Sequence, residues 1–318
     1  MLQGIKRRAG NFLRRQVADA IAESPLASDR PPAAAPDFPL GQLARPYYYL
    51  GDHRGLTKLS NGLPFFVNTR DRGITTWIVL GGIWETFVDD VLMALARPGQ
   101  VFLDIGANQG YYSVKLGHAV GPDGAGYCFE PNPELYPFLA DNIAINGMTG
   151  HVRTYPLAAG EGPGRSVLHF SYANMGGGWI VPPGDSGPGE AGVAVEIASI
   201  DAIVPPDRPV DLIKIDAEGF EPLVLRGMRR TLARSPGAAI VAEVSMAQWR
   251  RFGDPAAILG ELQGGRQALR IGHDGRLRPL SPAGAADLPA DFVSYVLLLP
   301  RAAEMEAAVA RFLDRGGA

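Results

Sequence analysis

The chain contains almost no cysteine and few histidines. Its single cysteine, Cys128, excludes an intramolecular disulfide and a cluster of thiolate ligands for zinc or an iron–sulfur centre. Its five histidines are scattered, with no HExxH motif and no pair four residues apart, which argues against a histidine-ligated metal. A protein without disulfides fits a reducing compartment, so we expect a cytoplasmic location.

Long apolar runs and an excess of basic charge are also missing. The longest strongly apolar run, around Trp77–Trp84, is far shorter than the roughly 20 residues of a membrane span. The basic N-terminus lacks the uninterrupted apolar stretch of a secretory signal, so we expect none. Thirty basic against thirty-three acidic residues leave a net charge of −3, which argues against nucleic-acid binding over the whole surface. Apolar residues make up 46% of the 318, enough for a packed core.

Two segments precede residues 47–318, which we expect to fold as one domain. Apolar residues recur at helical spacing over residues 1–23, with arginines mostly on the opposite face, and this pattern predicts an amphipathic helix. Such a helix can bind a membrane surface or a partner, or it can pack on its own domain or on a second subunit of a homo-oligomer. Residues 24–46 are rich in proline and alanine and predict an extended linker.

The rest of the sequence alternates short apolar runs with helical patterns. Strands are predicted at Leu63–Asn68, Val101–Ile105, Gly126–Glu130, His151–Leu157, Asp211–Asp216, Ala238–Val244 and Phe292–Leu299. Helices are predicted at Gly82–Leu95, Gln109–Val120, Pro133–Ile145, Pro222–Ala233 and Ala302–Leu313. Strands separated by helices indicate an α/β fold with a mostly parallel sheet and helices on both faces. Asp274-Gly275 marks a hairpin turn near the end.

Residues 160–192 interrupt this alternation. The segment contains ten glycines and four prolines, so it is unsuited to a helix, and it is long for a structureless loop. One interpretation is a surface hairpin. The other is a flap that covers the strand ends and contacts the substrate.

The most informative stretch is V-F-L-D-I-G-A-N-Q-G-Y-Y-S, Val101–Ser113, in which a buried strand runs into a glycine-rich turn and then a helix. In open α/β sheets, ligands bind at the carboxyl ends of the strands. Gly106 and Gly110 allow positive φ and a close approach of the ligand to the backbone. Glu130 ends the next strand, where a carboxylate can accept hydrogen bonds from both ribose hydroxyls. The pattern predicts a cofactor that contains adenosine.

The turn does not match a dinucleotide site. The G-x-G-x-x-G fingerprint is broken, because Ala-Asn-Gln-Gly follows Gly106. Asp104 adds a negative charge beside the loop, which is unfavourable for a pyrophosphate. S-adenosylmethionine (SAM) has no phosphate and carries an ammonium and a sulfonium group, so it suits an acidic loop better.

A second stretch, D-L-I-K-I-D-A-E-G-F-E-P-L-V-L-R-G, Asp211–Gly227, carries charges in and after an apolar strand. Buried charges are costly unless they are paired or used in function. We interpret Asp216 and Glu218 as functional, helped by Glu243 at the end of the following strand. They would form a general base or a Mg²⁺ site, since oxygen ligands suit magnesium. For Glu221 we favour a structural interaction with a helix N-terminus.

Five motifs stand out: W-E at Trp84-Glu85, F-L-D-I-G-A-N-Q-G-Y-Y-S at Phe102–Ser113, F-E-P-N-P-E at Phe129–Glu134, N-I-A-I-N-G at Asn142–Gly147, and L-I-K-I-D-A-E-G-F-E-P-L-V-L-R-G at Leu212–Gly227. Through them, roughly Gly82–Pro300 resembles the FkbM family of class I SAM-dependent methyltransferases. The resemblance implies a Rossmann-like seven-stranded sheet with an antiparallel last strand. It also implies O-methylation of a hydroxyl on a natural product, sugar or glycan.

The resemblance further implies which residues bind the cofactor. The loop residues are Asp104, Gly106, Ala107, Asn108 and Gly110, chiefly at its methionine part. Glu130 would hold the ribose, and Asn132 and Ala158 would border the adenine.

Two other functions remain open from the sequence. One is a nicotinamide-dependent oxidoreductase, against which the broken fingerprint and the absence of a Tyr-x-x-x-Lys pair weigh. The other is a non-catalytic module that keeps the SAM-binding fold for assembly, against which the intact Asp104, Glu130 and Asp216 weigh.

Overall fold

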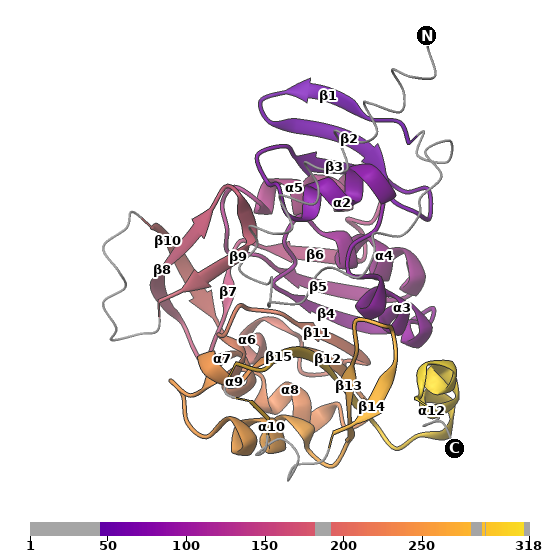
Figure 1. Cartoon of the computed structure of the whole chain (residues 1–318), viewed down its shortest axis with the longest axis vertical. Helices are drawn as coiled ribbons and strands as arrows, with labels where there is room; N and C mark the ends of the chain where they lie inside the picture. The colour runs from indigo at the N-terminus through magenta and orange to yellow at the C-terminus, as the bar shows by residue number, and fades with distance from the viewer. Residues whose placement is uncertain (1–44, 182–191, 281–287, 290, 315–318) are drawn as a thin grey trace.

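The computed structural model describes residues 45–181, 192–280, 288–289 and 291–314 (Figure 1). The predicted helix over 1–23, and the predicted linker over 24–46 apart from its last two residues, lie outside the described residues. No helix within the described ranges is both long and apolar enough to cross a membrane.

The centre of the molecule is an eight-stranded sheet with the strand order β14-β13-β15-β12-β11-β4-β5-β6. Its strands are β4 (Val101–Ile105), β5 (Ala125–Phe129), β6 (Val152–Tyr155), β11 (Leu212–Ile215), β12 (Ala239–Ser245), β13 (Gln267–Ile271), β14 (Leu277–Pro279) and β15 (Val293–Leu299). The five strands from β6 to β12 are parallel, and β15 runs antiparallel between β12 and β13. The predicted, mostly parallel sheet with an antiparallel last strand is confirmed, but it has eight strands rather than seven, because the short strand β14 pairs antiparallel with β13 at its edge.

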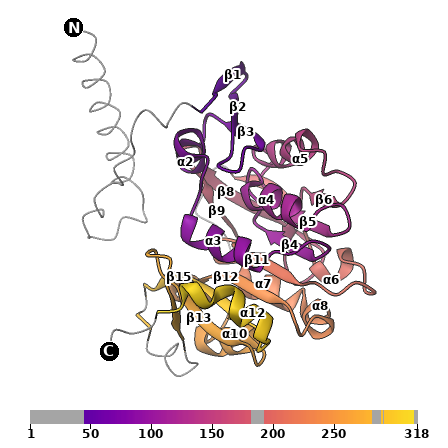
Figure 2. The same ribbon diagram turned by 90° about the vertical axis from the view of Figure 1, so that its right-hand side faces the viewer.

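Helices cover both faces of this sheet (Figure 2). One core contains α3 (Thr86–Leu95), α4 (Tyr111–Val120), α5 (Tyr136–Ile145) and α12 (Ala303–Val309). The other contains α6 (Ile200–Ile203), α7 (Glu221–Arg226), α8 (Arg229–Arg234), α9 (Met246–Trp249) and α10 (Pro255–Gln263). Successive strand residues enter opposite cores, as Phe102 and Leu103 do. Every residue of β4, β5 and β11 is buried for this reason.

Two predicted helices differ from the observed ones. The helix expected over Pro222–Ala233 is divided into α7 and α8 at Gly227, whose backbone lies so close to Gly160 that a Cβ would stand 1.8 Å from the Gly160 carbonyl oxygen. The helix expected over Gly82–Leu95 begins only at Thr86. Gly82, with φ of +66°, instead ends α2 (Ile74–Gly81), which the sequence analysis missed.

Two smaller sheets flank the central one. The first has the order β1-β2-β3, with β1 (Tyr48–Gly51), β2 (Arg54–Lys58) and β3 (Pro64–Asn68), the last of which was predicted. The second has the order β7-β10-β8-β9, with β7 (Ala158–Ala159), β8 (Gly164–Ser171), β9 (Asn174–Ile180) and β10 (Val193–Ala198). The glycine-rich segment therefore contains an antiparallel hairpin, β8–β9.

Chain order places a crevice between β4 and β11. The chain passes from β4 to β5 and β6 on one side and later from β11 to β12 on the other. The strand order thus reverses between β4 and β11, and ligands of open α/β sheets bind at the carboxyl ends of strands at such a point.

Candidate functional site

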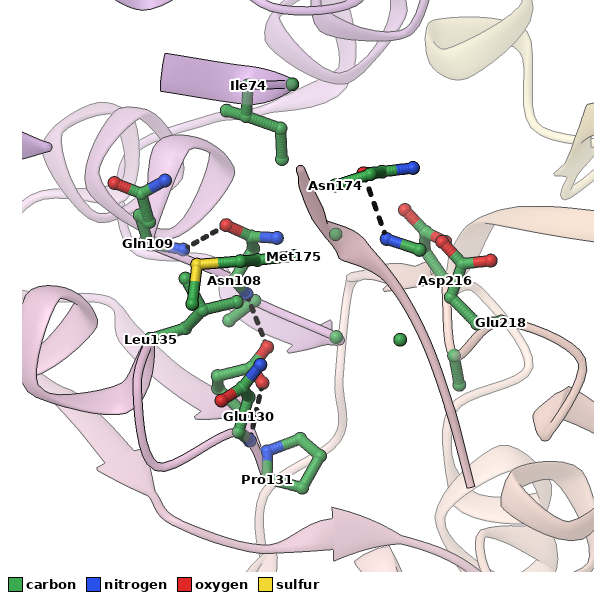
Figure 3. Close-up of a pocket in the computed structure, with 18 of the residues that line it drawn as sticks. Ile74, Asn108, Gln109, Glu130, Pro131, Leu135, Asn174, Met175, Asp216 and Glu218 are labelled. Carbon is green, nitrogen blue, oxygen red and sulfur yellow. Dashed lines mark hydrogen bonds between the residues drawn. The ribbon is translucent and has the colours of Figure 1, made fainter. Parts of the chain in front are cut away.

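A cavity of about 730 Å³ lies at this reversal, a size typical of small-molecule sites. Its wall includes the residues that follow β4, β5 and β11, Glu243 within β12, and the inner side of the β8–β9 hairpin. Figure 3 shows Asn108 and Glu130 at one side and Asp216 and Glu218 at the other, with Asn174 and Met175 of β9 beside them. Since β9 forms part of the wall, the glycine-rich segment contacts the cavity as the flap interpretation requires.

The backbone N–H groups of the loop after β4 already have hydrogen-bond partners in the protein. The N–H groups of Gly106 and Ala107 both donate to the Phe129 carbonyl, over 3.0 and 2.9 Å. The Asn108 N–H donates to Glu130 Oε2 at 2.7 Å, and the Gln109 N–H donates to the Asn108 side chain at 2.7 Å. A pyrophosphate site needs free N–H groups at this turn. The loop therefore does not offer the cradle of a dinucleotide.

The two predicted glycines of the loop are needed for close packing. Gly106 has a φ of +76°, and a Cβ on it would lie 1.7 Å from the Asp216 carbonyl oxygen. Gly110 has a φ of +92°, and its Cβ would lie 2.9 Å from Leu139 Cδ1. Gly106 therefore lets the loop after β4 touch the loop after β11, while Gly110 lets α4 approach α5.

Glu130 joins two loops at the cavity. Its carboxylate accepts hydrogen bonds from the backbone N–H groups of Asn108 and Asn132, both at 2.7 Å. Burial raises the pKa of Glu130 to about 7, against the lowering effect of these two hydrogen bonds. Asn132 and Ala158 complete this part of the wall.

Two predicted site residues, Asp104 and Gly110, do not line the cavity. Asp104 is fully buried, accepts a hydrogen bond from Ser113 Oγ at 2.5 Å and lies 3.7 Å from Lys214 Nζ. The other predicted site residues lie together in the wall: Gly106, Ala107, Asn108, Glu130, Asn132, Ala158, Asp216, Glu218 and Glu243. The contacts of Asp104 are those of a support for the loop and for Lys214.

Lys214 connects the cofactor side of the cavity to its acidic side. Its Nζ donates to the Gly106 carbonyl at 2.9 Å and lies 3.3 Å from Asp216 Oδ2. Burial alone would lower the pKa of Lys214, but the neighbouring carboxylates, led by Asp216, raise it above its ordinary value. The lysine therefore stays charged and provides Asp216 with a cationic partner.

Glu218 and Glu243 have no such partner at hydrogen-bond distance. Burial, followed by the charge of Asp216, raises the pKa of Glu218 to about 9 and that of Glu243 well above its usual range. The protonated form of Glu218 is therefore favoured at neutral pH, and burial shifts Glu243 in the same direction. Glu218 also has a φ of +51°, a conformation that costs a non-glycine residue about 1–3 kcal/mol and is typical of functional loops.

The sequence analysis assigned no role in the site to three of its polar residues, Glu85, Tyr112 and Tyr295. Glu85 lies just before α3 with a φ of +38° and accepts a hydrogen bond from Tyr112 OH at 2.9 Å. Tyr295, on β15, donates to Asp216 Oδ2 at 2.8 Å and lies 3.2 and 3.3 Å from the two oxygens of Glu85. The W-E and G-Y-Y motifs contain Glu85 and Tyr112, but nothing in the strand pattern around Tyr295 indicated a polar role.

Glu221 has the structural role favoured for it. Its carboxylate accepts from the backbone N–H groups of Ala217 and Gly219, at 2.8 and 3.1 Å, and from Trp249 Nε1 at 2.9 Å. Cys128 is fully buried in β5, as expected for a small apolar residue. In the part of the chain that the structure describes, no three His, Cys, Asp or Glu side chains are grouped to hold a metal ion. The Mg²⁺ option therefore stays a prediction without structural support.

Comparison with known proteins identifies the family. The profile described as Methyltransferase FkbM domain matches residues 104–268, more than half of the chain and both loops of the cavity. The chain belongs to the FkbM methyltransferase family. Membership in a family of methyltransferases weighs against a nicotinamide-dependent oxidoreductase, in agreement with the loop after β4, whose backbone N–H groups already have hydrogen-bond partners.

Individual proteins share less with this FkbM-family chain. Protein-L-isoaspartate O-methyltransferase of Aeropyrum pernix is 34% identical over 76 residues, which span 24% of this chain and 28% of that protein. A solved structure of Pyrococcus horikoshii TYW2 in complex with MeSAdo is 16% identical, with 79% and 71% of the two chains covered and a TM-score of 0.39. The O-methyltransferase TomG of Streptomyces achromogenes, solved with SAM, is 17% identical, with 68% and 78% covered and a TM-score of 0.35. The strand order of the sheet, rather than these superpositions, establishes the fold.

Proposed function

We propose that this FkbM-family chain methylates a hydroxyl group of a small molecule or saccharide, with Asp216 as the general base. The observation that carries the proposal is the position of Asp216. It lines the cavity, its backbone touches Gly106 of the cofactor loop, and its carboxylate is paired with Lys214.

The residues of the wall suit SAM. Glu130 presents a buried carboxylate to a ribose diol, Asn132 and Ala158 would border the adenine, and Gly106, Ala107 and Asn108 would hold the methionine part. When bound, SAM supplies a methyl group activated by a positive sulfur, so the protein mainly has to position the acceptor oxygen in line with it.

Asp216 supplies the base that an alcohol needs. An alcohol is a weak nucleophile until its proton is removed, and a positioned carboxylate can accept that proton as the carbon–oxygen bond forms. Lys214 and Tyr295 orient Asp216 through contacts of 3.3 and 2.8 Å. Met175, on β9, is buried beside the cavity and helps the hairpin to exclude water.

The charge of the wall defines the acceptor further. Five acidic side chains line the cavity: Glu85, Glu130, Asp216, Glu218 and Glu243. Of the basic side chains in the wall, Lys214 is already paired with Asp216 and Arg72 is exposed. A phosphate or carboxylate on the acceptor would leave water without an unpaired buried cation to compensate its charge, which is strongly unfavourable in a buried site. We therefore propose an uncharged, hydroxylated acceptor.

We expect a neutral acceptor to be methylated with a kcat/KM at least about tenfold above that of its phosphorylated or carboxylated analogue, because the site would bury an anionic group without an unpaired cation. The measurement is methyl transfer from labelled SAM to neutral sugars, glycosides and macrolides, each beside an anionic counterpart. A clear preference for the anionic member of each pair would contradict the acceptor class. Tight binding of S-adenosylhomocysteine without transfer to any hydroxyl would contradict O-methylation.

The Glu130→Gln substitution is expected to weaken binding of S-adenosylhomocysteine about tenfold or more, because the carboxylate accepts the ribose hydroxyls best when ionised. For the same reason, the affinity of the unmodified protein should rise with pH through about 7, the pKa of buried Glu130. Isothermal titration from pH 6 to 8.5 measures both effects. Glu196→Gln, on the exposed side of β10, is the matched control. Binding of NAD in place of S-adenosylhomocysteine would overturn the cofactor assignment.

A further inference from the structure

The hydroxyl of Tyr295 lies between two carboxylates that come from different parts of the chain. It is 2.8 Å from Asp216 Oδ2 and 3.2 and 3.3 Å from the two oxygens of Glu85. Glu85 also accepts a hydrogen bond from Tyr112 OH at 2.9 Å. Tyr295, Asp216 and Glu85 all line the cavity, so this chain of contacts begins at the base.

A phenol has one proton to donate and cannot donate it to both carboxylates at once. The shorter contact assigns that proton to Asp216 while Asp216 is ionised. Once Asp216 has accepted a proton from the substrate, it no longer competes for the phenol's proton. Tyr295 can then accept from Asp216 and donate to Glu85.

We propose that Tyr295 and Glu85 carry away the proton that Asp216 removes from the acceptor. The inference rests on the proposed function. With SAM bound, the acceptor oxygen would bond the methyl group as the methyl–sulfur bond breaks and its electron pair stays on sulfur, while the acceptor O–H bond breaks and Asp216 takes the proton. Asp216 passes that proton to the Tyr295 oxygen while Tyr295 passes its own proton to Glu85. Asp216 and Tyr295 return to their starting states, and Glu85 holds the proton until it is lost to water.

The groups around these three residues favour proton transfer from Asp216 to Glu85. Lys214, 3.3 Å from Asp216, favours a return of Asp216 to its ionised form. Burial, followed by the negative charge of Asp216, raises the pKa of Glu85 to about 7, so Glu85 is a better proton acceptor than an ordinary carboxylate. Several charged and titratable groups face Glu85 and Asp216. They are Lys214 on β11, Asp104 on β4, Tyr112 on α4, Tyr295 on β15, Glu218 after β11 and Glu243 on β12.

Glu85 and Tyr295 act through Asp216, so they are positioning residues and a loss of rate alone would not identify their role. The dependence of kcat on pH identifies their role. Glu85 must be ionised to receive the proton, so kcat of the unmodified enzyme should rise with pH through about 7. Glu85→Gln has nearly the same shape but cannot take a proton. We expect it to lower kcat about 10- to 100-fold and to abolish the rise near pH 7. Tyr295→Phe, which removes only the hydroxyl, should have the same effect.

The experiment measures kcat from pH 5.5 to 9 for the full chain and for both variants, together with thermal unfolding and binding of S-adenosylhomocysteine. Glu85→Asp keeps a carboxylate and should restore part of the rate with a pH-dependent rise. Glu134→Gln and Tyr127→Phe are controls outside the cavity wall, on a half-exposed rim and in the core of β5.

A rise near pH 7 that persists in Glu85→Gln would overturn the relay, as would a kcat of the unmodified enzyme that falls as the pH rises through 7. If a variant melts at a much lower temperature, the partial rescue by Glu85→Asp decides between a folding defect and a lost proton acceptor. Absence of methyl transfer to any hydroxyl by the unmodified enzyme would instead contradict the proposed function, so the two failures are distinguishable.

Discussion

Replacing Gly106 by alanine is expected to lower the melting temperature by about 10 °C and to abolish binding of S-adenosylhomocysteine. The new Cβ would stand 1.7 Å from the Asp216 carbonyl oxygen, and a positive φ of +76° adds strain for any residue with a Cβ. Together these effects should cost at least about 3 kcal/mol, because two backbone segments have to separate. Thermal unfolding and isothermal titration measure the two losses.

Gly99 provides the matched control. It has a similar φ of +82°, but a Cβ there would meet no atom within 4 Å. Gly99→Ala should therefore show the cost of strain alone, about 1–2 kcal/mol, with cofactor affinity unchanged. Equal effects at the two positions would show that the contact between the loops after β4 and β11 does not matter.

The Asp216→Asn substitution is expected to lower methyl transfer about 10²- to 10⁴-fold, the usual contribution of a positioned general base. The amide has the shape of the carboxylate but cannot accept the proton at neutral pH. Affinity for S-adenosylhomocysteine should change little, because Asp216 lies across the cavity from Glu130 (Figure 3). The melting temperature should fall somewhat, because buried Lys214 loses a charged partner at 3.3 Å.

Single-turnover methyl transfer, with EDTA and with added Mg²⁺, checks this expectation. Asp123→Asn, an exposed aspartate, serves as the control. Full activity of Asp216→Asn would remove Asp216 from the mechanism. A rate that EDTA abolishes and Mg²⁺ restores would favour a metal in place of a carboxylate base.

The sequence predicted the central sheet well because the signals for its strands are local. A short apolar run followed by glycine marks β4, and the bounds Val101–Ile105 were predicted without error. The run Leu212–Ile215 and its following carboxylate placed Asp216 at a strand end in the same way. In a parallel sheet such ends meet at one edge, so most of the predicted site residues do line one cavity.

Contacts between residues far apart in the sequence determined features that the sequence pattern did not predict. The helix expected over Pro222–Ala233 breaks at Gly227, where the backbone lies too close to Gly160 for a side chain. A glycine within a helical pattern costs only about 1 kcal/mol, so the sequence alone did not predict the break. Asp104 belongs to the same motif as Gly106, yet it points behind the loop to Ser113 and Lys214. Asp104 is part of strand β4 and is enclosed by its neighbours, whereas Gly106 belongs to the loop that follows the strand and reaches the cavity.

By itself, the sequence indicated where the central strands lie along the chain, the glycine-rich turn and the type of cofactor, because spacing and polarity act between neighbours in the chain. Only the tertiary structure decided that the Tyr295 hydroxyl lies between the carboxylates of Glu85 and Asp216. Glu85 and Tyr295 are 210 positions apart in sequence and meet only because β15 inserts beside β12. Such a meeting depends on how the whole sheet is assembled, and no periodicity within either segment reports it.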